Sequence, residues 1–476
     1  MQSRLSRRVA WIGVLAGCCA MYAAPGEPSA VTVLVDARNP GAEIPADFQG
    51  LSFEMETLLP GKAGYFKGSN PALAETFHNL GIRSLRIGGN TADRPTIPFP
   101  AIADVDRAFD FAKSARDGVI FTFRLRAGGP DDAAPIARHI VERYRSSLVC
   151  FAIGNEPDVY AKTYPAYRAE LDRYMQAFAA AGVDAATFCG PGTTPGKAAW
   201  ARQFAEDFAS SARVRLVTQH AYFGGNSRKV ADPAVARSAM LSAAWEESYR
   251  RFYQSFVPAV EAGKLAYRIE ETNSFYNGGA KDVSDTFAAA LWGLDYLHWW
   301  AAHGAAGVNF HTGEQVAAGD ETTPCYYAVI HESEHGYRIQ PLGYAMKAFD
   351  LAGHGRVVPV QLQSGPAGLN LRSYAVLSAD NRLYVTLINK ESGSAARVAA
   401  VSVVAGAGYA RGEILRLEVP GGDVSAKSGV TLGGSSIEEN GAWHGTWKPL
   451  EGAQDGRFPV QVPAASAAIV RFSAER

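Results

Sequence analysis

The chain has 476 residues, of which 47% are apolar and 20% are charged. This composition excludes a disordered or fibrous protein, and the length suffices for one large domain and a smaller one. Lys and Arg total 46 against 47 Asp and Glu, a net charge of −1. Such a balance provides no long-range field for nucleic acid, and no basic-aromatic pattern supports binding to it.

The N-terminus is typical of an export signal. Three arginines within positions 4–8 precede an apolar run at 9–15, which is too short to span a bilayer. Residues 15–18, Leu-Ala-Gly-Cys, resemble a bacterial lipobox, so a lipid on Cys18 would be the only membrane contact. Ordinary cleavage after Ala20 or near residues 23–24 is the alternative. We expect residues 1–24 to be a signal peptide and the protein to be periplasmic, lipid-anchored to the outer membrane, or secreted by a bacterium.

Strand-like runs alternate with helical stretches over residues 46–350. Eight such runs occur, at 51–55, 84–87, 119–125, 148–153, 187–190, 215–218, 265–269 and 307–310. Stretches such as 166–181 and 287–302 have the length and apolar spacing of the intervening helices. The pattern predicts an α/β fold, a (β/α)8 TIM barrel.

The segments before and after the predicted barrel have a different residue pattern. Residues 351–476 contain short alternating runs, such as 382–389 and 467–472, separated by Gly, Asn and Ser turns. This pattern of short alternating runs and turns predicts a C-terminal antiparallel β-sandwich domain. Residues 25–45 form a tether and an N-terminal strand, 31–35, which we expect to pair with the C-terminal domain.

Three cysteines remain after the signal: Cys150, Cys189 and Cys325. Their number is odd and their spacing is not that of a metal site, so no disulfide framework is expected. Cys150 and Cys189 lie in strand-like runs and are interpreted as buried apolar thiols. A bridge between these two is the alternative.

Two strand-like runs end in carboxylates. The run 148–153 is followed by Asn155, Glu156 and a proline, and the run 265–269 ends in Glu270 and Glu271, 115 residues after Glu156. The first segment also suits the start of a helix. The carboxyl ends of barrel strands converge on one cleft, however, and two carboxylates there are what glycoside hydrolysis requires.

Polar or aromatic side chains follow six of the eight runs. They are Glu54 and Glu56, Asn90, Asn155 and Glu156, His220 and Tyr222, Glu271, and His311. Any one of them is readily explained as a scaffold residue. Their concentration at the same end of the strands predicts a functional cleft there.

These motifs resemble those of known glycosidases. Asn155-Glu156 after the fourth strand and Glu271 at the seventh resemble the clan A retaining glycoside hydrolases. The segment 271–279, Glu-Thr-Asn-Ser-Phe-Tyr-Asn-Gly-Gly, with Ser-Asp-Thr-Phe-Ala-Ala at 284–289, resembles glycoside hydrolase family 79, which contains β-glucuronidases and heparanases. The resemblance implies a retaining β-glucuronidase with Glu156 as acid/base and Glu271 as nucleophile. It also implies no metal or nucleotide cofactor, and as partner a glycan or glycoside that contains glucuronic acid.

Glu270 competes with Glu271 for the role of nucleophile. Neighbouring side chains on a strand point to opposite faces, so only one of the two should face the cleft. The register of the family motif selects Glu271. Glu270 is then expected to pair with a nearby Arg or Lys of the barrel scaffold.

The resemblance also implies a set of sugar contacts. Asn155 would bind the 2-hydroxyl and Glu54 another hydroxyl, and further sugar-contacting positions are Asn90, Tyr222 and His311. For the uronic acid carboxylate, Lys281 is the obvious cation by its place in the sequence. The resemblance points instead to Tyr276, Tyr344 or Tyr326 and to the backbone N–H groups around Asn277 and Gly278. Tyr327 is the alternative to Tyr326.

Three other functions stay open at this point. They are a heparanase-like endo-β-glucuronidase, which would need a basic groove, a clan A enzyme for neutral sugars, and a non-catalytic surface protein that binds glycans. The sequence also leaves open exo against endo action, the physiological glycan, tolerance of a 4-O-methyl group, and the oligomeric state.

Overall fold

The computed structural model describes residues 30–474, apart from 62–63, 67–69, 185, 320, 407 and 452–455. The expected signal peptide and the lipobox at Cys18 lie outside the described residues. Within the described part, no helix combines the length and the hydropathy that crossing a bilayer requires.

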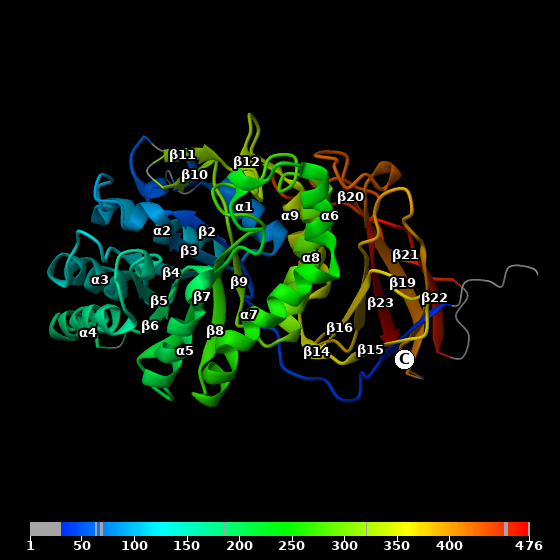
Figure 1. Ribbon diagram of the computed structural model, residues 1–476, viewed down its shortest axis with the longest axis horizontal. Coiled ribbons are helices and arrows are strands. Elements are labelled where there is room, and N and C mark those ends of the chain that lie inside the picture. The colour runs from blue at the N-terminus through cyan, green and yellow to red at the C-terminus, as the bar shows by residue number, and fades with distance from the viewer. Residues whose placement is uncertain are drawn as a thin grey trace, which may run out of the picture.

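Eight parallel strands close into a barrel, which confirms the predicted fold class (Figure 1). β2 pairs with both β3 and β9, and this second pairing closes the ring. The strands form because short, β-prone apolar runs are buried on both faces by the barrel interior and the surrounding helices. They are β2 (Gln49–Glu54), β3 (Ser84–Gly88), β4 (Gly118–Phe123), β5 (Leu148–Ile153), β6 (Phe188–Pro191), β7 (Val214–Ala221), β8 (Ala266–Thr272) and β9 (Val308–His311).

Helices surround the barrel. They are α1 (Pro71–Leu80), α2 (Ile102–Ala115), α3 (Pro130–Tyr144), α4 (Tyr164–Ala180), α5 (Ala198–Asp207), α6 (Pro233–Leu241), α7 (Ala243–Ala262), α8 (Phe287–Ala302) and α9 (Pro341–Ala352). α8 and α9 lie between the barrel and the C-terminal sheets (Figure 1). α8 is apolar around almost its whole circumference, as expected of a helix covered on every side.

The C-terminal part is a sandwich of two sheets (Figure 1). The larger sheet contains β14 (Arg356–Val358), β16 (Leu371–Leu377), β17 (Leu383–Asn389), β19 (Tyr409–Glu418), β20 (Thr431–Leu432), β21 (Lys448–Pro449) and β23 (Ser466–Ala474). The smaller sheet contains β15 (Val360–Gln363), β18 (Ala399–Val404), β22 (Arg457–Val462) and, from the N-terminus, β1 (Val31–Val35). β1 is antiparallel to β15 but parallel to β18, so one pair among the described strands of the sandwich is parallel.

Two hairpins follow the last barrel strand. β10 (Gln315–Ala318) pairs with β11 (Glu321–Pro324), and β12 (Ile330–Glu332) pairs with β13 (Tyr337–Ile339). Both hairpins lie at the upper edge of the molecule in Figure 1, beyond the carboxyl ends of the barrel strands. They therefore belong to the same end of the barrel as the predicted cleft.

Cys150 and Cys189 form a disulfide, so their interpretation as free thiols is wrong. They lie on the adjacent strands β5 and β6, with 5.8 Å between their Cα atoms. Strand alternation turns Phe151 outward onto α4, which leaves Cys150 facing the barrel interior with Cys189. The spacing in the sequence gave no sign of this contact because it arises from strand pairing. Cys325 is a buried free thiol.

A buried ion pair joins the barrel to the sandwich. Lys390, which follows β17, lies 2.6 Å from the carboxylate of Asp295 on α8, and both side chains are almost fully buried. The Tyr374 hydroxyl donates a second hydrogen bond to Asp295.

We expect Asp295→Leu to lower the free energy of unfolding by about 3–5 kcal/mol, because the Lys390 ammonium would stay buried without its partner. Denaturant unfolding of the variant and the wild type measures the change. The control is Asp295→Leu combined with Lys390→Met, which removes both charges and should recover much of the loss. A double variant as unstable as the single one would contradict the role of the unpaired charge.

Candidate active site

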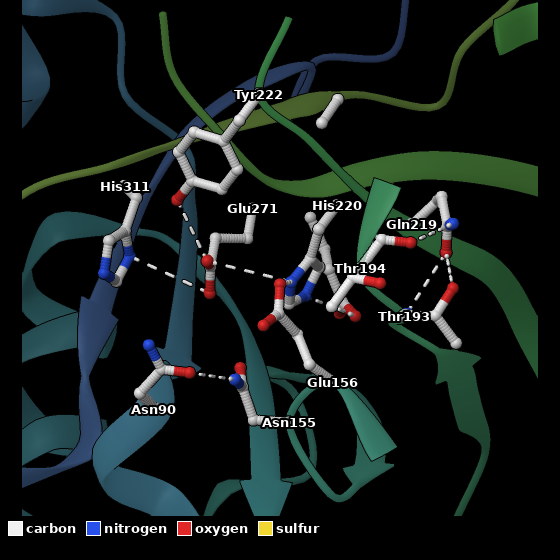
Figure 2. Close-up of polar contacts among 12 residues, drawn as sticks. Asn90, Asn155, Glu156, Thr193, Thr194, Gln219, His220, Tyr222, Glu271 and His311 are labelled. Atoms are coloured by element: carbon white, nitrogen blue, oxygen red, sulfur yellow. Dashed lines mark hydrogen bonds and ion pairs between the residues drawn. The ribbon is translucent and has the colours of Figure 1, made fainter. Parts of the chain in front are cut away.

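Two carboxylates and one imidazole meet at the carboxyl ends of three barrel strands (Figure 2). Glu156 follows β5, His220 lies near the end of β7, and Glu271 lies near the end of β8. Nδ1 of His220 is 3.0 Å from Oε1 of Glu156 and 3.7 Å from Oε1 of Glu271.

The spacing of the two carboxylates suits one type of glycoside hydrolysis. One oxygen of Glu156 and one of Glu271 lie within 4.8 Å of each other. Carboxyl groups about 5–5.5 Å apart are typical of retaining glycosidases, whereas inverting enzymes need about 6.5–9.5 Å to admit a water molecule. The arrangement therefore fits a nucleophile and an acid/base on one sugar.

Glu271 is held as an anion. Arg86, buried on β3, donates to its Oε2 at 2.5 Å, and the Tyr222 hydroxyl donates to its Oε1 at 2.9 Å. Burial by itself would raise the pKa of this carboxyl, but the charges of His220, His311 and Arg86 and the bond from Tyr222 hold the pKa far below its usual range. A carboxylate that is ionised and directed at the cavity has the state a nucleophile requires.

Glu156 has the opposite tendency. Burial raises its pKa, the negative charges of Glu271 and Asp158 raise it further, and the hydrogen bond from His220 offsets only part of the effect. The side chain is 18% exposed, so it can still reach a substrate. Two nearby carboxyls with pKa values displaced in opposite directions are a common sign of an acid and a nucleophile.

His220 contacts three carboxylates, those of Glu156, Glu270 and Glu271. Although burial lowers its pKa, the charge of Glu271 and the hydrogen bonds to Glu156 and Glu270 raise the pKa to about 10. The imidazole is therefore a cation at neutral pH. The sequence placed His220 at a strand end but did not identify it as a site residue.

Among the described residues, Glu270 forms no direct ion pair with an Arg or Lys, although the charge of Arg86 helps to lower its pKa. Its Oε1 instead lies 3.8 Å from Nε2 of His220. The register between β7 and β8 shifts after Gln219, so that His220 pairs with Glu271. This bulge lets two successive glutamates reach the same imidazole, although Glu271 lines the cavity and Glu270 does not.

The carboxylates open into a cavity of about 460 Å³. Seven of the predicted sugar-contacting or catalytic residues line it. The lining consists of Asn90, Glu156, Thr194, Pro195, Gly196, Tyr222, Glu271, Tyr276, Asn277, His311, Ala317 and Tyr327. The described lining contains no Arg or Lys, and Lys281 lies elsewhere.

Two predicted tyrosines do not reach this cavity. Tyr344 lies on α9, where its hydroxyl accepts a hydrogen bond from the backbone N–H of Ile437. Tyr326 is absent from the described lining, and its backbone N–H donates to the carbonyl of Gly278. Tyr327 takes the place at the cavity, where its ring lies near those of Tyr222 and His311. Adjacent residues in an irregular segment cannot be told apart by sequence pattern.

Three other predicted residues lie behind the lining. The buried carboxylate of Glu54 accepts from Thr91 and from the backbone N–H of Ala317. Asn155 accepts from Arg86 at 2.7 Å and has its amide nitrogen 3.3 Å from Oδ1 of Asn90. Gly278 has φ of +82°, and a Cβ there would lie 2.5 Å from the carbonyl oxygen of Pro324. Glycine thus lets this loop pack against the β10–β11 hairpin.

Arg86 is a site residue that the sequence did not identify. Its guanidinium bridges Glu271 and Asn155, and it is fully buried in the barrel. A charged residue in the middle of the apolar run 84–87 was the available signal, because a buried guanidinium needs anionic or carbonyl partners.

The same side chains also form a group with metal-ligand chemistry. One atom each from Glu156, His220 and Glu271 lies within 4.8 Å of the others. The imidazole would have to lose its proton before it could bind a cation. Retaining glycoside hydrolysis needs no metal, so a chelator distinguishes the two possibilities.

Comparison with known proteins agrees with this geometry. Residues 373–469 match the glycosyl hydrolase family 79 C-terminal beta domain. A β-glucuronidase of Neurospora crassa is 24% identical over 358 residues, which cover 62% of this chain and 62% of that protein. A β-glucuronidase of Aspergillus niger is 27% identical over 113 residues, covering 22% of this chain and 19% of that protein. The chain thus spans less than two thirds of the length of either relative.

Solved structures share the fold over almost the whole chain. A 4-O-α-L-rhamnosyl-β-D-glucuronidase from Fusarium oxysporum has a TM-score of 0.72 at 18% identity, covering 92% of this chain and 99% of that one. A family 51 arabinofuranosidase from Xanthomonas axonopodis has a TM-score of 0.68 at 14% identity, covering 93% and 100%. These two proteins act on different sugars, so the shared fold by itself does not select a substrate.

Proposed function

Because the chain belongs to glycoside hydrolase family 79, we propose that it is a retaining β-glucuronidase that removes terminal β-linked glucuronic acid from glycans or glycosides. The observation that carries the proposal is the pair Glu156 and Glu271. Their oxygens lie within 4.8 Å of each other, and their pKa values are displaced in opposite directions.

In the first step, the Glu271 carboxylate attacks the anomeric carbon. Glu156 gives its proton to the glycosidic oxygen, the bond to the aglycone breaks, and a glycosyl ester forms on Glu271. His220 donates to Oε1 of Glu156, which leaves the other oxygen to carry the transferred proton. The protonated imidazole also limits the repulsion between the two carboxyls.

In the second step, water releases the sugar. Once Glu271 is esterified, the negative charge that raised the pKa of Glu156 is gone. Glu156 then ionises more readily and takes a proton from the water that attacks the anomeric carbon. Glu271 returns to its ionised state, in which Arg86 and Tyr222 again donate to it.

The sugar carboxylate needs hydrogen-bond donors in a cavity whose described lining offers no Arg or Lys. We assign this role to Tyr276 and Asn277, with Tyr327 as a third candidate in place of Tyr326. Tyr276 is 40% exposed at the rim, and Asn277 has φ of +63°. Neutral donors suit a single carboxylate, whereas a polysulfated chain calls for a cationic groove. The lining therefore favours an exo-glucuronidase over a heparanase-like endo enzyme.

We also propose that the protein is exported, with Cys18 as the site of a lipid anchor. The basic and apolar N-terminal segment supports export. The Cys150–Cys189 disulfide supports it independently, because disulfides persist in oxidising compartments. Mass determination of the mature N-terminus, together with membrane fractionation, tests both parts of this proposal.

A panel of aryl glycosides tests the substrate. We expect turnover of the β-glucuronide, retention of the anomeric configuration in the first product, and little turnover of the β-glucoside, the β-xyloside or the α-L-arabinofuranoside. Heparan sulfate is the comparison for endo action. Hydrolysis of a neutral glycoside with no glucuronide turnover would overturn the proposal, and binding without any turnover would favour a glycan-binding protein.

Metal removal is a second arm of the same assay. Activity should be unchanged after dialysis against EDTA, since neither step requires a cation. Loss of activity that added divalent metal restores would instead assign Glu156, His220 and Glu271 to a metal centre.

A further inference from the structure

The backbone that presents Glu156 is in an unusual conformation. Glu156 has φ of 47° and ψ of 56°, the left-handed region, directly after Asn155 and two residues after Gly154, whose φ is 82°. This region is unfavourable for a residue other than glycine, which persists there only where its surroundings hold it. Something outside the turn must therefore fix the direction of the Glu156 side chain.

Asp93 provides such a restraint. Its Oδ2 accepts the backbone N–H of Asn155 at 2.6 Å and the hydroxyl of Tyr160 at 2.5 Å. Its Oδ1 accepts the backbone N–H groups of Leu125 and Arg126 at 2.6 and 2.7 Å. Asp93 is only 5% exposed. One carboxylate thus ties together the segments that follow β3, β4 and β5.

Tyr160 closes the turn from the other side. Its hydroxyl also lies 3.2 Å from the carbonyl oxygen of Asn155, and a Cβ at Gly154 would lie 2.8 Å from that hydroxyl. The Glu156 backbone N–H donates to the carbonyl of Gly192, so the β6 segment holds the next peptide. Neither Asp93 nor Tyr160 lines the cavity, and the two steps proposed above use neither of them.

We propose that Asp93, together with Tyr160, is a positioning residue for the acid/base: it holds the Asn155–Glu156 turn so that the Glu156 carboxyl meets the glycosidic oxygen. This inference rests on the proposed function of Glu156. A misplacement of a reacting group by about 1 Å can cost about 100-fold in rate, so the restraint matters without touching the substrate.

The test is the dependence of kcat/KM on the leaving group. A 2,4-dinitrophenyl β-glucuronide needs almost no protonation to depart, whereas methyl β-glucuronide depends on it fully. In Asp93→Asn, an amide N–H₂ faces backbone N–H donors and the turn loses its restraint. We expect kcat/KM to fall about 100-fold for the methyl glucuronide and to change little for the dinitrophenyl glucuronide.

Two further variants make the result decisive. Glu156→Ala should show an even larger difference between its kcat/KM values for the dinitrophenyl and the methyl glucuronide. Azide should restore the turnover of the dinitrophenyl glucuronide by this variant. Asp104→Asn is the matched control, since Asp104 is another buried aspartate that accepts a backbone N–H, at the start of α2 and away from the site. It should lower stability without changing the ratio of the two kcat/KM values.

The outcomes separate the two proposals. If Glu156→Ala lowers kcat/KM mainly for the methyl glucuronide, but Asp93→Asn lowers kcat/KM equally for both substrates, the positioning role is wrong. If Glu156→Ala lowers kcat/KM equally for both substrates, the proposed function of Glu156 is wrong. Should Asp93→Asn not fold, Tyr160→Phe removes only one hydroxyl from the same clamp, and an unchanged ratio in that variant would overturn the inference.

Discussion

Glu271→Ala should abolish hydrolysis, with kcat for an aryl β-glucuronide falling on the order of 10⁵-fold. The variant lacks the carboxylate that forms the glycosyl ester, and Glu156 is the only other acidic residue in the described lining of the cavity. Initial rates measured at saturating substrate give the loss. Binding of glucuronic acid, followed by calorimetry, should survive, because the remaining lining is unchanged.

Labelling identifies the nucleophile without relying on a loss of activity. A 2-deoxy-2-fluoro β-glucuronide with a good leaving group should accumulate as a covalent adduct, and peptide mass spectrometry should place it on Glu271. Glu270→Gln is the matched control because it changes the neighbouring carboxylate, which contacts His220 but not the cavity. It should still be labelled at Glu271. An adduct on Glu270, or near wild-type turnover by Glu271→Ala, would contradict the assignment.

Glu156→Gln should lower kcat/KM for an unactivated glucuronide on the order of 10³-fold and remove the basic limb of its pH profile. The proton on Glu156 is needed for bond cleavage, and the pKa of Glu156 is raised, so wild-type activity should be lost as the pH rises through that pKa. The pKa of Glu271 is lowered, so the acidic limb should lie below the usual range of a glutamate. A pH profile from acid to alkaline conditions checks both limbs.

The wild-type profile measured with the dinitrophenyl glucuronide is the internal control. Its kcat/KM should lack most of the basic limb even with Glu156 present, since this leaving group departs unprotonated. A basic limb that persists in Glu156→Gln would assign it to another group. His220 is the first candidate, because its pKa is raised to about 10.

Much of the fold could be predicted from local patterns. The spacing of apolar residues within a short segment is enough to predict a strand or a helix. It predicted the eight strand runs, the helices at 166–181 and 287–302, and the short alternating strands after residue 350. Glu156 and Glu271 could be placed at one site for a similar reason. Each ends a buried strand, and barrel closure brings the ends of all strands to one face.

Local residue patterns were enough to predict the barrel, the sandwich and the two carboxylates, but the contacts around the carboxylates arise only in the folded chain. The tertiary structure joined Cys150 to Cys189, placed Tyr327 rather than Tyr326 at the cavity and put Tyr344 in the core. It also gave Glu270 an imidazole partner and Glu271 a guanidinium. These contacts join residues far apart in the chain, and they depend on strand register, on one bulge between β7 and β8, and on irregular loops. Apolar periodicity carries no information about any of these three features, whereas it specifies the strands and helices directly.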